Sequence, residues 1–243
     1  MSDKNPIINP KALPFNSIEF DSIENNHFIP AIEEGIKRKN MLYQEMSNDT
    51  SEPTFDNTLL KLENSDNLLS RAASTYFHLF GSESDKEMQA MAPKISPMLS
   101  KCSNDFYLNE NIFKRIDHIY KNMDDLNSED QRLVEVYHMN FVRNGANLSS
   151  KEKEKLRSID EKLAELSPQF SNNVLNATNT YYIHIQDESD LDGLPDNLVS
   201  TASEDAKSRD LDGWVFTHQM PSFLPFMKYC KNRELRKKLL ISR

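Results

Sequence analysis

The chain has 243 residues and a formal net charge of −9, which disfavours nucleic acid or an anionic lipid surface as a partner, because phosphate binding needs a basic surface. No apolar run approaches the roughly 20 residues that span a bilayer, so we expect no membrane partner. Only 37% of the residues are apolar and 28% are charged, so we expect either an elongated helical architecture or a chain that packs against a part this sequence lacks.

Residues 1–28 are predicted to form an extended arm. Pro6, Pro10 and Pro14 recur every four residues, and each proline removes a backbone donor and pushes the preceding residue toward extended geometry. We expect the arm to lie on the surface of something larger, with a disordered tail as the alternative. The segment also lacks the apolar core of a secretory signal, which favours a cytoplasmic location.

Residues 29–179 are predicted to form a helical lobe. Its first helix is expected to begin at Pro30, a residue suited to the first helical turn. A second helix is expected to be capped by Thr54 and to continue through Phe80, because apolar residues recur at steps of three and four. These apolar residues are Phe55, Leu59, Leu62, Leu69, Ala73, Tyr76 and Phe80.

The next two helices of the lobe are expected within residues 85–102 and directly after Asn109. The first of them contains Pro93 and Pro97, which predict a kink or a break. Asn109 is expected to cap the second, since an asparagine side chain can accept from the first free backbone amides of a helix.

The lobe is expected to end with two more helices, each opened by a capping box. Ser128 with Gln131 and Ser149 with Glu152 have the required spacing. The second helix is the longest, and Pro168 is expected to bend it. One of its faces is apolar and consists of Leu156, Ile159, Leu163, Leu166, Phe170, Val174 and Ala177.

The pattern changes in residues 180–243. Residues 180–186 alternate with a strand period, and residues 214–219 give a second strand candidate that could pair with the first. A last helical stretch opens at Pro221 and reaches Arg243 without a cap, so we expect the chain to be truncated there. The predicted fold is mainly α, with long antiparallel helices in a helical-hairpin bundle and a small two-stranded β element near residues 180–219.

The search for a metal site centres on the histidines. Zinc hydrolases often place two histidines four residues apart on a helix with a glutamate beside the first. No two histidines here have that spacing, and none is followed by glutamate, so no metal-binding residue is predicted. The histidines are His27, His78, His118, His138, His184 and His218.

Catalytic nucleophiles are not predicted either. Cys102 and Cys230 are too few for a disulfide framework, lack a Cys-x-x-Cys spacing and are best read as small core residues. The chain has no Gly-x-Ser-x-Gly motif. Its carboxylate clusters, Asp124-Asp125 and residues 188–192, read as solvated loop charge. The residue chemistry alone therefore indicates a non-catalytic helical domain, with no catalytic residue assigned.

Several segments nevertheless occur in an order and spacing that is specific. The chain resembles the N-terminal part of the zinc oligopeptidase family that includes thimet oligopeptidase, oligopeptidase A and bacterial peptidyl-dipeptidase, with the last as the nearest branch. The matching segments are Asn5-Pro6, His27-Phe28-Ile29-Pro30-Ala31, Pro53-Thr54-Phe55-Asp56-Asn57-Thr58, Leu62-Glu63, Phe141-Val142-Arg143-Asn144-Gly145-Ala146, Leu191-Asp192-Gly193-Leu194-Pro195, Gly213-Trp214-Val215-Phe216-Thr217, Pro221-Ser222 and Asn232-Arg233-Glu234-Leu235-Arg236.

The resemblance implies a mainly helical fold with two lobes flanking a deep channel. One zinc ion near the channel floor would be held by a His-Glu-x-x-His helix and a later glutamate, and short peptides would enter the channel. Those motifs do not occur in this sequence, so no catalytic, metal-binding or substrate-binding residue is carried over. The resemblance also implies that residues 180–243 lead toward the absent catalytic domain.

The favoured interpretation is therefore the channel-walling, substrate-gating part of a cytoplasmic zinc-dependent oligopeptidase or peptidyl-dipeptidase, inactive by itself. Its partners would be short peptides and the missing catalytic domain in cis, and its exposed lobe-facing surface could self-associate. One alternative is a stand-alone, non-catalytic helical interaction module. Another is an independent hydrolase with an unrecognised site.

Overall fold

The structure is a computed structural model that describes residues 5–242. Residues 1–4 of the expected arm and Arg243, at the end of the expected last helix, lie outside the described residues. The chain divides at Pro168 into two compact units, residues 1–168 and 169–243.

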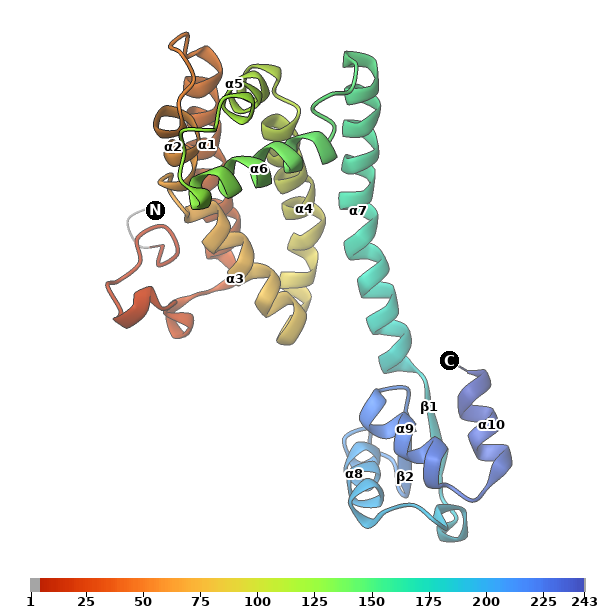
Figure 1. Cartoon of the computed structure of the whole chain (residues 1–243). Helices are drawn as coiled ribbons and strands as arrows, with labels where there is room; N and C mark the ends of the chain where they lie inside the picture. Colours follow the sequence, from red (N-terminus) through yellow and green to blue (C-terminus); the bar gives the residue numbers. More distant parts are fainter. Residues whose placement is uncertain (1–4, 243) are drawn as a thin grey trace. The chain divides into compact units, whose positions relative to one another are not determined.

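The mainly α fold with a small two-stranded antiparallel sheet is confirmed (Figure 1). Before the first long helix, the arm forms three short 3-10 turns, Pro14–Asn16, Phe20–Ser22 and Asn25–His27. The helical segments that follow are α1 (Phe28–Asn48), a π-helical turn (Asp56–Leu60), α2 (Lys61–Glu63), α3 (Leu68–Ser82), α4 (Lys86–Tyr107), α5 (Glu110–Lys121), α6 (Ser128–Arg143) and α7 (Ser150–Thr180).

The main core of the first unit lies where α1 packs against α3 and α4. Gly35 permits the close approach of α1 to α3, because a Cβ atom there would lie 2.8 Å from the backbone of Leu69. Tyr76 is fully buried, and its hydroxyl donates to the carbonyl of Met88 at 2.7 Å. The buried apolar side chains of this core are Ile7, Phe28, Ala31, Ile32, Leu68, Ala72, Tyr76, Met88, Met91, Ala92 and Ile95.

The prediction of one continuous helix from Thr54 through Phe80 is wrong, because the chain leaves the helical conformation between α2 and α3. The Ser65 hydroxyl donates to the Leu62 carbonyl at 2.6 Å, and the Asp66 carboxylate accepts from the Leu68 amide at 2.6 Å. These side chains offer the backbone local partners that compete with helical hydrogen bonds. The apolar periodicity on either side does not report this interruption.

The prolines of α4 do not break it. Pro93 and Pro97 lie inside one uninterrupted helix, so the expectation of a break is wrong. A proline inside a helix costs roughly 3 kcal/mol, and here burial of the neighbouring Ala92 and Ile95 against α1 and α3 opposes that cost. Pro168 likewise lies inside the continuous helix α7.

The predicted helix starts are mostly correct. The Asn109 side chain caps α5, accepting from the amides of the second and third residues that follow it. The box before α7 is confirmed, since the Ser149 amide donates to the Glu152 carboxylate at 2.9 Å and the Glu152 amide to the Ser149 hydroxyl at 3.4 Å. The box at Ser128 is wrong, because Asn127 caps α6 and Gln131 instead donates to two carbonyls of the preceding turn.

The second unit contains the predicted sheet, in which β1 (Tyr182–Ile185) pairs antiparallel with β2 (Trp214–Thr217), Ile183 lying opposite Phe216. Gly213 adopts a φ of +87°, and a Cβ there would lie 2.4 Å from the carbonyl oxygen of Ile185, so the turn into β2 requires glycine. The helices of this unit are α8 (Asp196–Lys207), α9 (Met220–Tyr229) and α10 (Arg233–Ile241).

The expected last helical stretch is two helices, because the chain turns between α9 and α10. The Asn232 side chain caps α10 by accepting from the amides of Glu234 and Leu235. The sheet and these helices enclose their own core, which includes Ile183, Ile185, Phe216, Phe223, Phe226, Cys230 and Leu239. No helix within residues 5–242 combines the length and the apolar character needed to cross a membrane.

Candidate functional site

The histidines make separate local contacts. His27 Nδ1 accepts from the Glu24 amide at 3.0 Å, and His138 contacts Asp117 at 3.2 Å while its ring stacks on Tyr120. Across residues 5–242, no three His, Cys, Asp or Glu side chains lie close enough together to hold a metal ion. The part of the chain that the structure describes therefore does not fit a protein-bound zinc ion.

The two cysteines are buried and unpaired with each other. Burial raises the pKa of the Cys102 thiol above its usual value, and burial likewise raises that of Cys230. Both thiols are protonated near neutral pH, which is the opposite of what a nucleophilic thiolate requires.

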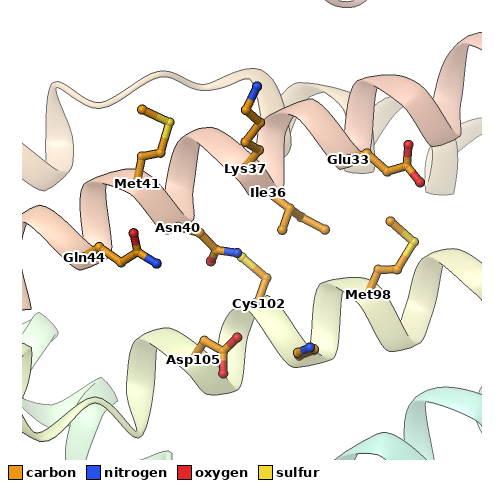
Figure 2. Close-up of a pocket in the computed structure, with 10 residues that line it drawn as sticks. Glu33, Ile36, Lys37, Asn40, Met41, Gln44, Met98, Cys102 and Asp105 are labelled. Atoms are coloured by element: carbon orange, nitrogen blue, oxygen red, sulfur yellow. The ribbon is translucent and has the colours of Figure 1, made fainter.

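A groove with a volume of about 470 Å³ lies between α1 and α4 (Figure 2). Figure 2 shows Asn40 of α1 and Cys102 of α4 pointing toward each other between the two helices. The groove combines apolar side chains with carboxamides and charges on its rim. Its lining residues are Glu33, Ile36, Lys37, Asn40, Met41, Gln44, Met98, Lys101, Cys102 and Asp105.

A second, more polar hollow continues the groove along α1. It shares Asn40, Gln44 and Asp105 with the first and extends to Asn48 and to Arg157 of α7. The Arg157 guanidinium donates to the Asp105 carboxylate at 2.8 Å and forms an ion pair with it. The stretch of α1 that lines the two hollows, residues 33–48, is about 22 Å long at the helical rise. An extended peptide of six or seven residues has about that length.

Several polar groups of this groove are available for binding. Asn40 and Gln44 make no hydrogen bond within residues 5–242, so their carboxamides are free to pair with a peptide main chain. Lys101 has no ion-pair partner among the described residues and leaves one positive charge on the rim. Burial raises the pKa of the Cys102 thiol in this groove, and no metal-ligand cluster occurs among its described residues.

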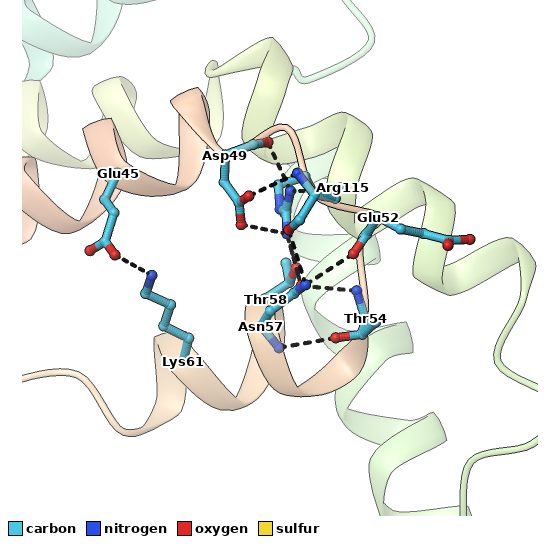
Figure 3. Close-up of polar contacts among 9 residues, drawn as sticks. Glu45, Asp49, Glu52, Thr54, Asn57, Thr58, Lys61 and Arg115 are labelled. Atoms are coloured by element: carbon cyan, nitrogen blue, oxygen red, sulfur yellow. Dashed lines mark hydrogen bonds and ion pairs between the residues drawn. The ribbon is translucent and has the colours of Figure 1, made fainter.

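The segment between α1 and the π-helical turn is held by a buried arginine, Arg115 of α5 (Figure 3). Its Nη1 donates to the carbonyls of Asp49 and Ser51, both at 3.0 Å. Its Nη2 donates to Asn57 Oδ1 at 2.8 Å and pairs with Asp49 Oδ2 at 3.0 Å, and its Nε donates to Thr58 Oγ1 at 3.3 Å.

Every nitrogen of the Arg115 guanidinium thus has a partner from this chain, which identifies the cluster as structural. Hydrogen bonds from Ser51, together with the nearby Arg115 charge, lower the pKa of Asp49. Thr54 and Asn57 also cap each other, the amide of each donating to the side chain of the other. The Pro53–Thr58 segment, which carried part of the family resemblance, is therefore explained by folding.

Two other segments that carried the resemblance are also structural. Phe141 is fully buried, with its ring 4.7 Å from that of Phe106. Gly145 ends α6 with a φ of +94°. The amide of Lys231 donates to the Asp192 carbonyl at 3.0 Å, which fastens the loop before α8 to the end of α9.

Helix α7 has two different faces. Lys153 and Arg157 turn toward α5 and α4, pairing with Glu110 at 3.3 Å and with Asp105. The apolar face predicted from the sequence remains exposed within the first unit, where the relative exposures are 46% for Ile159, 53% for Leu163 and 48% for Leu166. We call these three residues the α7 stripe. Phe170 and Val174, on the part of α7 that belongs to the second unit, are also exposed.

Neither the α1–α4 groove nor the Arg115 cluster is predicted from the sequence. The spacing of Ile36, Asn40 and Gln44 was the available signal for the groove, since residues four apart share a helix face. The partners of Arg115 lie 57 to 66 residues away in sequence, so no local pattern reports them.

Comparison with known proteins finds sequence similarity to several peptidases. Dipeptidyl carboxypeptidase of Escherichia coli strain K12 is 32% identical over 245 residues, covering 100% of this chain and 36% of its own length. Oligopeptidase A of Haemophilus influenzae is 31% identical, covering 98% and 35%. The probable cytosolic oligopeptidase A of Arabidopsis thaliana is 27% identical, covering 95% and 34%. No family model matches the sequence.

The three alignments cover nearly the same share of each relative. The chain spans about a third of the length of these curated relatives, and it matches their N-terminal third.

Proposed function

Over its full length this chain is related to the thimet oligopeptidase family, and on that premise we propose that it is the N-terminal, non-catalytic part of a zinc-dependent peptidase that hydrolyses short peptides. The observation that carries the proposal is the extent of the similarity. The alignment with dipeptidyl carboxypeptidase covers all of this chain and only 36% of that enzyme.

The chemistry of hydrolysis would belong to the remaining two thirds. A zinc ion in such enzymes supplies an activated water and polarises the scissile carbonyl. Residues 5–242 bring no suitable set of ligands together, so we assign the zinc site to a catalytic domain in cis and derive no catalytic step from this chain. This chain would contribute a wall of the substrate channel that admits short peptides, in a cytoplasmic enzyme.

The α7 stripe supports a partner outside residues 5–242, which this proposal places in cis. Ile159, Leu163 and Leu166 are each about half exposed on one helix face, although apolar side chains of this size gain roughly 1.5–3 kcal/mol when fully buried. A catalytic domain that covers this face would recover that free energy. In this scheme residues 29–179 form the helical lobe, preceded by the arm of residues 1–28, and residues 180–243 lead toward the catalytic domain.

A comparison of two proteins tests the proposal. The product of the full reading frame should hydrolyse a quenched fluorescent oligopeptide, and a zinc chelator should abolish that activity, whereas residues 1–243 should show no turnover with or without added zinc. Turnover by residues 1–243 that survives the chelator would contradict the proposal and favour an independent hydrolase.

A stand-alone interaction module is the second candidate, and the same stripe favours it, because a partner in trans could also cover it. The mass of the native protein separates the two. A cellular product of 28.2 kDa, the mass of this chain, would support the interaction module. A product about three times heavier would support the peptidase, given the 36% coverage of the relative.

A further inference from the structure

The apolar residues of α7 in the first unit repeat with the period of a coiled-coil seam. From Leu156 through the three residues of the α7 stripe, the steps are three, four and three residues along one continuous helix. If Leu156 takes position a of a heptad, Leu163 takes the next a, and Ile159 and Leu166 take the two d positions. Leu156 is half-buried, whereas the α7 stripe is exposed. The helix therefore carries a line of apolar side chains with the spacing that a facing helix requires.

The seam is narrow. Its flanking positions are polar, with Lys155 and Lys162 at g, and Asp160 and Ser167 at e. A helix that packs on a globular core usually has apolar residues at e or g as well, whereas a strict a and d pattern is typical of a coiled coil. The width of the seam therefore fits one helix better than a sheet or a broad globular face.

Helices α4 and α5 hold α7 from a different side. Lys153 is buried and pairs with Glu110 of α5 at 3.3 Å, and Arg157 pairs with Asp105 of α4 at 2.8 Å. In the same heptad Lys153 is at e and Arg157 at b. The contacts that attach α7 to the rest of its unit thus leave the a and d positions of the stripe for another helix.

The charges beside the seam restrict the partner. Lys155 and Lys162 are exposed and form no ion pair within residues 5–242. Charged residues at the e and g positions of a coiled coil set which helix pairs with which. A helix with acidic side chains opposite these two lysines would be attracted, and a helix with basic side chains there would be repelled.

The length of the seam favours a partner in the same protein. The seam from Leu156 to Leu166 is about 15 Å long at the helical rise, which is less than the three or four heptads of a stable coiled coil. Two separate copies would therefore associate weakly through it. A helix of the same chain is at an effective concentration in the millimolar range. The relatives are about three times longer than this chain, so such a protein has the residues to supply that helix.

We propose that Leu156 and the α7 stripe form one side of a two-helix coiled coil, whose other side is a single α-helix of the same protein outside residues 1–243. That helix presents apolar a and d residues to the stripe and acidic side chains to Lys155 and Lys162. The inference rests on the proposed function, which supplies the rest of the chain. It deepens that function by naming the kind of element that covers α7.

Cysteine scanning along α7 tests the inference. Single cysteines replace three seam residues and three exposed residues on the other sides of the helix, and iodoacetamide alkylation is compared in residues 1–243 and in the product of the full reading frame. Seam thiols should react at least about tenfold more slowly in the longer protein, and the other thiols equally fast in both. The unsubstituted proteins give the background. The substitutions are Ile159→Cys, Leu163→Cys and Leu166→Cys in the seam, and Ser158→Cys, Glu161→Cys and Glu165→Cys elsewhere.

The pattern of protection separates this inference from the proposed function. Protection that extends to Ser158, Glu161 or Glu165 would show that a broad surface covers α7, which would overturn the single-helix inference and leave the proposed function standing. Absence of protection at all six positions would overturn both.

A charge reversal tests the acidic flank of the partner helix. Leu166→Cys serves as the reporter, and the ratio of its alkylation rates in the two proteins cancels any direct effect of charge on the thiol. Lys162→Glu should lower that ratio at least about threefold, because an attraction becomes a repulsion. Lys151→Glu, at an exposed position away from the seam, is the matched control and should leave the ratio unchanged. An unchanged ratio in the Lys162 variant would overturn the acidic flank.

Discussion

The inner faces of α1, α3 and α4 differ from the α7 stripe in what covers them. Leu68 of α3 is 2% exposed inside a core that the chain completes by itself, whereas Leu163 of α7 is 53% exposed. Both lie in helices with a clear apolar periodicity. The difference shows that apolar periodicity indicates that a face needs a partner, without saying whether the same chain supplies it.

This difference also separates apolar residues that this chain needs for its own folding from apolar residues that a partner would bury. The core around Tyr76 and Ile95 is required for this chain to fold. The α7 stripe contributes little to the folding of residues 5–242, since it contacts little of this chain. Its leucines and isoleucine are consistent with burial in a larger protein, as the proposed function expects.

A matched pair of substitutions tests the comparison with the largest expected effect. Leu68→Ala should lower the free energy of unfolding by about 2–5 kcal/mol, because it leaves a cavity in a closed core. Leu163→Ala should change it by less than about 0.5 kcal/mol, because the site is already open to water. Urea unfolding of both variants measures the difference. Similar losses for the two variants would show that α7 is packed within this chain.

Arg115 gives the next largest effect. Arg115→Met should lower the free energy of unfolding by about 3 kcal/mol, because the buried acceptors that now bind the guanidinium would lose their hydrogen-bond donor. Arg132→Met, on the exposed surface of α6, is the control and should cost less than about 0.5 kcal/mol. Equal unfolding midpoints for the two variants would contradict a structural role for Arg115.

A smaller effect is expected from acid at the start of α4. The Asp85 carboxylate accepts from the Met88 amide at 2.7 Å and from the Asn25 side chain at 2.8 Å, and these hydrogen bonds lower its pKa. Because the folded-state pKa lies below the unfolded value, the stabilisation is complete above the ordinary aspartate pKa and is lost as the pH falls through the folded-state value.

Asp85→Asn isolates this contribution, since asparagine still caps a helix but does not titrate. The wild-type chain should be slightly more stable than the variant at neutral pH, and the gap should close in acid. Urea midpoints measured at a series of pH values report it. A gap that widens as the pH falls would contradict the sign of the shift.

The smallest effect on stability is expected when charged residues are introduced into the α7 stripe. Leu163→Glu combined with Leu166→Glu should leave the unfolding midpoint nearly unchanged, because glutamate is a good helix former and both sites are exposed. The variant should also bind less of an apolar dye and self-associate less in sedimentation. Lys162→Glu, one residue off the stripe, should change neither the dye binding nor the association. A large loss of stability in the double variant would mean that this chain covers the stripe.

The features predicted correctly from the sequence are mainly local ones. The caps at Asn109 and Ser149 depend on side chains within three residues of the amides they bind, so spacing suffices to find them. The pairing of β1 with β2 followed from residue alternation and from Gly213 before the second strand. The interruption after α2 depends equally on local bonds, from Ser65 and Asp66, yet apolar periodicity does not register it.

The remaining features depend on contacts between distant segments. Pro93 and Pro97 are tolerated in a helix packed against α1 and α3. The α1–α4 groove exists because two helices from different parts of the chain pack together. The activity was predicted from the family resemblance and not from residue chemistry.

The proposed function requires that the rest of a peptidase covers the α7 stripe. The thiol introduced by Leu163→Cys measures this directly, because Cys102 and Cys230 are buried and should react slowly. Iodoacetamide should alkylate the new thiol rapidly in residues 1–243 and slowly in the product of the full reading frame. Equal rates in the two proteins would contradict the account.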